Sequence, residues 1–141
     1  MTENIRQWLR KSCPLISKDD VFNINHLEAD TISYTIDNVP GITVLQSYLN
    51  GDSIRQKSFV IASRQEYSND VLSNISATGF WDEFELWIEN QNKTKNYPSM
   101  KEGQRIQSIY VTSSYYIYST GPNTARYQIQ ITVTYFQKGE R

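Results

Sequence analysis

The stretch of sequence that decides the fold is Tyr127-Gln128-Ile129-Gln130-Ile131-Thr132-Val133-Thr134-Tyr135-Phe136, near the C-terminus. Large apolar residues take every second position from Tyr127 to Tyr135, and glutamine or threonine takes each position between them. Successive side chains of a β-strand point to opposite faces of the sheet. The alternation therefore predicts a strand with one face in the core and the other face open to solvent.

The residues before this stretch predict its antiparallel partner. We expect a long hairpin in which residues 105–119 form the first strand, residues 120–124 the connection and residues 125–137 the second strand. Both faces of the first strand are partly apolar. One face carries Ile109, Val111, Tyr115 and Ile117, and the other carries Tyr110, Thr112, Tyr116 and Tyr118. A sheet with helices on one side needs only one apolar face, so the tyrosine-bearing face is expected to contact another molecule. The alternative is that the tyrosines are simply good strand formers that cover neighbouring strands.

A second hairpin is predicted between residues 43 and 63. Its strands are residues 43–49 and 53–63, and Asn50-Gly51 between them favours a type I′ turn. In the second strand Arg55 and Lys57 lie on the face that becomes apolar farther along. These two cations indicate either an edge or interface, or solvated charges at the point where the strand leaves the core.

Shorter elements are expected before this hairpin. The three- and four-residue spacing of Ile5, Trp8 and Leu9 predicts an N-terminal helix at about residues 3–12, which Thr2 could cap and Pro14 would end. Alternation over residues 31–36 then predicts a short strand.

The main helix is predicted between the two hairpins. Apolar and polar residues separate into an inward stripe of Phe80, Phe84, Trp87, Ile88 and Gln91 and an outward set of Asp82, Glu83, Glu85 and Glu89. Gly79 is expected to begin or interrupt this helix, because a glycine inside a helix costs about 1 kcal/mol relative to alanine. Residues 68–76 would then form a preceding turn or a shorter helix.

Together these elements predict an α+β fold, an antiparallel sheet of about four to five strands with helices packed on one face. The 141 residues fit a single domain, residues 1–141, with the sheet and main helix at about residues 31–138. Fourteen basic and fifteen acidic residues give a net charge of −1, which disfavours binding to phosphate backbones or anionic lipid through bulk charge. The N-terminus lacks the apolar run of a secretory signal, so a cytosolic site of synthesis is expected.

Candidate catalytic and metal-binding residues are few. His26 is the only histidine and Cys13 the only cysteine, and neither lies in a recognisable nucleophile motif. The pair cannot supply the four ligands of a typical zinc site, and Asp19-Asp20 is a commonplace solvated sequence. We therefore expect no enzyme activity, no cofactor and no bound metal.

Several segments, taken in order, resemble a family of small virion proteins of tailed bacteriophages and prophages of Gram-positive bacteria. Members are called minor capsid proteins and are related to tail terminator, or tail-completion, proteins. The likeness covers about residues 31–138 and is carried by Val39-Pro40-Gly41, Tyr48-Leu49-Asn50-Gly51, residues 56–64, Gly79-Phe80-Trp81-Asp82-Glu83-Phe84, residues 87–92 and residues 124–130. Each segment is a core pattern rather than a catalytic signature.

The resemblance implies a structural role in the virion, after synthesis in the cytoplasm of the bacterial host. The chain would form a ring, typically sixfold in tail terminators, that caps the tail tube and joins it to the head. Its partners would be other copies of itself, the major tail protein and a head-completion protein, with neither a small-molecule substrate nor a membrane, and nucleic acid would only pass through the ring as DNA. Such a ring needs a heterologous interface that closes on itself.

The residues expected at the assembly interface come from both hairpins. They are Arg55, Lys57, Tyr110, Tyr116, Tyr118, Gln128, Gln130 and Phe136. The alternative function is a nucleic-acid-binding α+β module, in which sheet aromatics would stack on bases. A weak basic surround argues against it, because Arg126 is the only cation of the final hairpin after Arg105.

Overall fold

The computed structural model describes residues 1–16, 21–24, 33–66, 71–120 and 124–139. The expected strand at residues 31–36 begins, within that part, at Ser33. The elements in chain order are α1 (Thr2–Ser12), β1 (Val21–Ile24), β2 (Ser33–Asn38), β3 (Thr43–Ser47), β4 (Ser53–Glu66), α2 (Val71–Thr94), β5 (Gln104–Thr120) and β6 (Thr124–Gln137).

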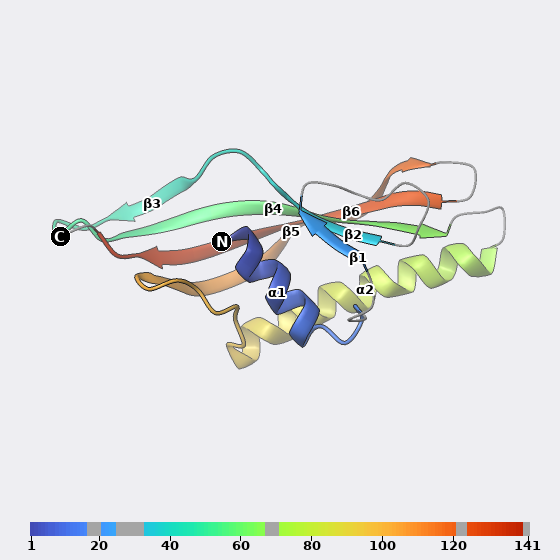
Figure 1. Ribbon diagram of the computed structural model, residues 1–141, viewed down its shortest axis with the longest axis horizontal. Helices are drawn as coiled ribbons and strands as arrows, with labels where there is room; N and C mark the ends of the chain where they lie inside the picture. The colour runs from blue at the N-terminus through green and yellow to red at the C-terminus, as the bar shows by residue number, and fades with distance from the viewer. Residues whose placement is uncertain (17–20, 25–32, 67–70, 121–123, 140–141) are drawn as a thin grey trace.

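The strands form one six-stranded sheet, and both helices lie on the same side of it (Figure 1). The strand order is β1-β2-β4-β6-β5, and β3 also pairs with β4. This arrangement confirms the predicted α+β fold with helices on one face. The expected four to five antiparallel strands correspond to β2 to β6, and the structure adds β1, which was not predicted and pairs with β2 in parallel.

Strands β2 and β3 follow one another along the same edge of β4. Residues of β2 pair with the C-terminal half of β4, and residues of β3 pair with its first residues. The chain leaves the ladder between them at Pro40 and Gly41, where Gly41 has a φ of 97°, a backbone conformation that favours glycine. One long edge is therefore built from two short strands.

The centre of the sheet is the long pairing of β4 with β6, which extends from Ser53–Gln137 to Glu66–Thr124. Every second residue of β6 from Tyr127 to Tyr135 is buried, as the alternation predicted. Strand β5 pairs with the other side of β6 but slips register at four places. These bulges correct the expected regular alternation of β5, and Ile117, expected on the dry face, is half exposed.

Helix α2 is continuous through Gly79, so the expected break at this residue is wrong. A methyl group built on Gly79 would meet no neighbouring atom within 4 Å. Phe84 and Ile88 are buried as predicted, and Trp81, absent from the predicted stripe, is fully buried beside them. The ring of Tyr115 stacks on Trp81 and ties α2 to β5.

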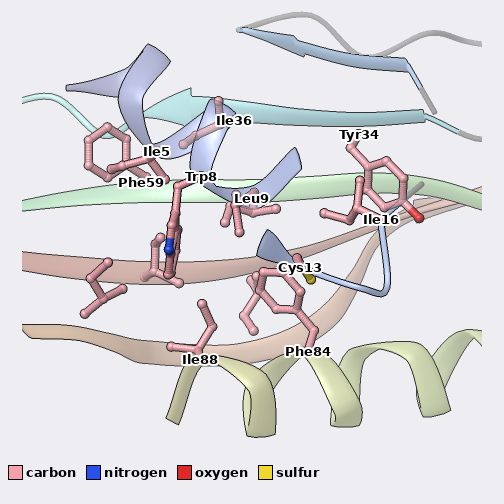
Figure 2. Close-up of a cluster of buried hydrophobic side chains, with 14 of the residues drawn as sticks. Ile5, Trp8, Leu9, Cys13, Ile16, Tyr34, Ile36, Phe59, Phe84 and Ile88 are labelled. Atoms are coloured by element: carbon pink, nitrogen blue, oxygen red, sulfur yellow. The ribbon is translucent and has the colours of Figure 1, made fainter. Parts of the chain in front are cut away.

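Helix α1 completes the core. Figure 2 shows Ile5, Trp8 and Leu9 pointing from α1 into the cluster that Phe84 and Ile88 enter from α2. The expected cap at Thr2 is wrong, because the helix starts after Met1 without a side-chain cap and the Thr2 hydroxyl donates to Asn38 Oδ1 instead. The helix ends before Pro14, as expected.

The β3–β4 hairpin extends away from both helices and forms an arm, which comprises β3, the turn at residues 48–52 and the start of β4 at residues 53–57 (Figure 1). The predicted type I′ turn is wrong, because Gly51 has a positive φ of 94° and Asn50 does not. The Gly51 amide donates to the Tyr48 carbonyl oxygen (3.0 Å), which makes a wider turn with glycine in the left-handed position.

The C-terminal segment fixes the tip of the arm. The buried Asp52 carboxylate accepts a hydrogen bond from the Gly139 amide (2.8 Å). The two backbones approach so closely that a methyl group on Gly139 would lie 2.5 Å from the carbonyl carbon of Gly51. The tip is thus held by the end of β6 rather than by a helix.

Candidate functional site

The face of the sheet opposite the helices, here called the open face, carries most of the predicted interface residues. It is formed by the even-numbered residues of β4 and β6 and by the β5 residues that pair with the latter. Tyr110 and Tyr116 are 57% and 46% exposed on it. Gln128, Gln130 and Phe136 lie on the same face and are half-buried, and the side chain of Tyr118 lies outside the described residues.

A chain of polar contacts crosses the open face from β2 to β5. Arg126 Nη2 lies 3.0 Å from the Asp37 carboxylate, and Arg126 Nε donates to Gln128 Oε1 at 3.3 Å. Gln128 Nε2 in turn donates to the Tyr116 hydroxyl. The Tyr116 side chain is therefore held in one position, so less side-chain entropy is lost when another molecule covers its ring.

A row of hydroxyl groups crosses the same face nearer the arm. Ser58 Oγ and Thr112 Oγ1 both contact Thr132 Oγ1, at 2.8 and 3.0 Å, which links β4 through β6 to β5. Tyr110 is the direct cross-strand neighbour of Thr132. The open face between the two tyrosines is consequently neutral and already hydrogen-bonded.

Gln130 and Phe136 are the two remaining predicted residues on the open face, and both make contacts there. The Gln130 carbonyl oxygen accepts a hydrogen bond from the Thr112 hydroxyl at 3.4 Å. The Arg105 guanidinium lies over the Phe136 ring, 5.4 Å from its centroid. Phe136 thus adds a partly covered apolar surface at the end of the open face next to the arm.

Arg55 and Lys57 do not lie with the tyrosines. They are on the opposite, helix-side face of β4, in register with Tyr135 and Val133. The Arg55 guanidinium donates to Ser53 Oγ (2.9 Å) and interacts electrostatically with the Tyr135 hydroxyl, while Lys57 Nζ lies 5.7 Å from the Phe59 ring centroid. The predicted interface residues therefore divide between two surfaces, because alternation places a strand's odd and even residues on opposite faces.

The outer edge of β5 is covered by side chains that the sequence interpretation did not assign to it, including Glu85, which was expected to face outward. Ile109 both donates to Asn92 Oδ1 (2.9 Å) and accepts from Asn92 Nδ2 through its backbone. The Tyr97 hydroxyl donates to the Gln107 carbonyl oxygen at 3.0 Å, and Glu85 Oε1 accepts from the Tyr115 amide at 3.3 Å. Helix α2 and the segment after it thus satisfy backbone groups that an edge strand would otherwise expose.

The arm shows the reverse situation, which the sequence interpretation also missed. All five residues of β3 are exposed, and the apolar residues with high exposure include Ile42, Val44, Leu45, Tyr48 and Leu49. A signal for this surface exists in the sequence, since residues 39–51 contain no charged residue although edge strands are commonly protected by charges.

The remaining candidates for chemistry are either structural or outside the described residues. Cys13 is buried, and burial raises the pKa of its thiol to about 11, so the reactive thiolate is scarce near neutral pH. His26 and Asp19-Asp20 lie outside the described residues. Among the residues that are described, no three histidine, cysteine, aspartate or glutamate side chains gather into a group able to hold a metal ion.

A hollow of about 420 Å³ lies between α1 and the segment after α2. Its polar groups serve to attach the helix: Trp8 Nε1 donates to the Asn96 carbonyl oxygen and Asn4 Nδ2 to the Ser99 carbonyl oxygen. The Glu3 carboxylate in its wall accepts hydrogen bonds from Arg6 and Gln7. These groups are engaged in holding α1 in place.

No helix in the described part of the chain has both the length and the apolar character needed to cross a membrane. Comparison of the sequence with models of known protein families gave no match, and comparison with curated proteins gave none either.

Proposed function

We propose that this chain is a structural subunit of a bacteriophage virion that acts by assembling into a ring on the tail tube, as a tail terminator or head–tail joining protein. The proposal starts from the sequence resemblance. The observation that supports it best is the open face, which presents the exposed rings of Tyr110 and Tyr116 on a neutral, hydrogen-bonded sheet. Exposed aromatic residues on a rigid support are typical of protein contact surfaces.

In this proposal the open face contacts the tail tube or a neighbouring subunit. The chain would act through surface complementarity, without turnover of a substrate and without a cofactor. The partners are further copies of the chain, the major tail protein and a head-completion protein, and the working location is the virion.

The test is binding of the purified chain to tubes assembled from the major tail protein encoded beside it, measured by co-sedimentation. Replacement of both tyrosines, Tyr110→Ser with Tyr116→Ser, should weaken binding by about 30-fold, because a pair of interface anchors contributes about 2 kcal/mol or more. The free energy of unfolding should change little, since both rings are exposed.

The matched control is Ile117→Ser, which removes a side chain of similar exposure from the next position of the same strand, on the opposite face. Its binding to the tubes should equal that of the unaltered chain. Equal binding by the tyrosine variant, or no binding by the unaltered chain, would refute the proposal.

The alternative function, a nucleic-acid-binding module, would use the same two tyrosines to stack on bases. Arg126, the open-face cation closest to Tyr116 in this network, is already paired with Asp37. Binding of a single-stranded oligonucleotide at low salt separates the two functions, because contacts to phosphates weaken steeply as salt rises. Salt-sensitive binding that the tyrosine variant abolishes, together with no binding to tubes, would favour the alternative.

A further inference from the structure

The arm presents an apolar surface that none of the described residues covers. Val44 and Leu45 of β3 are about half exposed, and Leu49 at the tip is fully exposed. No side chain of the described residues hydrogen-bonds to the β3 backbone, whereas β5 has several such contacts. A strand edge of this kind is suited to bind another protein surface.

A groove of about 250 Å³ lies on the outside of the helix layer, where the end of α1 meets α2. Pro14, Leu15 and Trp87 form its apolar walls together with Leu86, which is 63% exposed. Glu83 and Asn90, both exposed, add a carboxylate and an amide to the same groove. The groove therefore offers apolar surface and hydrogen-bonding groups side by side.

The polar residues of the groove repeat a pattern that α2 already uses. Glu85 and Asn92, seven residues apart, bind backbone groups of β5 within the same chain. Glu83 and Asn90 have the same types and the same spacing but come two residues earlier, which is a rotation of about 200° around the helix. Helix α2 thus carries one pair for its own edge strand and a second pair directed outward.

The charges of the arm and of the outer face of α2 are complementary. Arg55 and Lys57 lie on the arm, and neither forms an ion pair within the described part of the chain. Glu83 and Glu89 are exposed on α2 and likewise form no ion pair there. Because the two surfaces have opposite signs and lie on different parts of the molecule, attraction between copies is head to tail.

We propose that the arm of one copy binds the groove of a second copy, with Leu49 and its neighbours against Leu86, the β3 edge beside Glu83 and Asn90, and Arg55 and Lys57 facing the acids. This inference rests on the proposed ring function and names its interface between neighbouring subunits. Arm and groove are different surfaces, so the contact is heterologous, and a pair that makes it once leaves one arm and one groove available at its two ends. Repetition of the contact closes a ring or extends a chain.

The experiment is sedimentation velocity of the full chain over a concentration series, with charge reversals on each surface. An arm variant, R55E with K57E, and a helix variant, E83K with E89K, should each lower the association constant at least tenfold. The chain that carries all four changes should return to within about threefold of the unaltered chain, because the attraction is restored with reversed signs. The control, K95E, alters one exposed lysine after the end of α2, outside both surfaces, and should associate normally.

A second measurement does not depend on the charge variants. The exposed pair L49C with L86C should form a ladder of disulfide-linked oligomers on oxidation, while L49C with I117C should not. The native Cys13 gives little background, because its thiol is buried and mostly protonated.

The proposal is overturned if the unaltered chain does not self-associate, if the four-change chain fails to recover while both reversal variants are folded, or if no ladder forms. These outcomes are distinguishable from failure of the proposed function. Self-association through the arm without binding to tail tubes would refute the virion role and keep this interface, and tube binding without the ladder would do the opposite.

Discussion

The two outer parts of the sheet are completed in different ways. The β5 edge is bulged and covered by Asn92, Tyr97 and Glu85 of the same chain. The β3 edge keeps its apolar side chains in solvent, and the C-terminal segment holds its tip through Asp52. The contrast indicates that folding of one chain satisfies the first edge, whereas the second is available for contacts between chains.

The largest effect is expected where α2 is anchored beneath the sheet. Phe84→Ala removes a fully buried ring and should lower the free energy of unfolding by about 3–5 kcal/mol, through lost burial and the cavity left behind. Leu45→Ala on the exposed arm should change it by less than about 0.5 kcal/mol. Chemical denaturation measures the free energy of unfolding of both variants. Similar losses of stability in the two would contradict this prediction.

High pH should lower the free energy of unfolding through Cys13, which lies in the buried core between the helices and the sheet. Burial raises the pKa of this thiol from 9.0 to about 11, so the unfolded chain loses its proton first as the pH rises. The free energy of unfolding should therefore be unaffected below about pH 9 and fall by about 1.4 kcal/mol per unit up to about pH 11.

Urea denaturation at several pH values measures this dependence, and Cys13→Ala isolates it from the tyrosines. The free energy of unfolding of the unaltered chain, relative to that of Cys13→Ala, should fall over that window. A parallel response of both proteins would show that the thiol ionises normally in the folded chain.

Removal of the amide that covers the β5 edge should have an intermediate effect. Asn92→Ala leaves the backbone donor and acceptor of the buried Ile109 without their partner, at a cost of about 1–3 kcal/mol. The variant should also self-associate non-specifically, because it exposes the β5 edge.

Asn90→Ala is the matched control for stability, since its exposed side chain lies two residues earlier on the same helix. Its free energy of unfolding should stay within about 0.5 kcal/mol of the unaltered chain. Thermal denaturation measures the loss of stability, and light scattering measures the non-specific self-association. If Asn92→Ala and Asn90→Ala lower the free energy of unfolding equally, the proposed distinction between the two edges is wrong.

The smallest effect is expected at the tip of the arm. Gly139→Ala places a methyl group against the Gly51 backbone and should lower the local stability of the arm by about 1 kcal/mol. The effect should be seen as faster hydrogen exchange of the arm amides. Gly79→Ala, in open space within a helix, should instead stabilise the chain by up to about 1 kcal/mol. If the arm amides of the Gly139 variant exchange as slowly as those of the unaltered chain, the C-terminal segment does not hold the tip.

Local periodicity was sufficient for the main elements. The alternation in β6 predicted its buried residues from Tyr127 to Tyr135, and the stripe that includes Phe84 and Ile88 predicted the inner face of α2. It failed at Gly79, where α2 continues through a residue of low helix propensity, and at Asn50-Gly51, where the turn depends on the strands it joins. The candidate interface was predicted residue by residue, but not as two separate surfaces.

The sequence by itself determined the main strands and helices and the buried face of β6, because these depend on a repeat of two or about four residues along the chain. Only the tertiary structure decided that β2 and β3 share one edge of β4, that β1 joins in parallel, and that α2 covers β5 while the arm stays bare. Those outcomes depend on contacts between residues far apart in the chain, such as Asn92 with Ile109 and Asp52 with Gly139, and no local pattern encodes them.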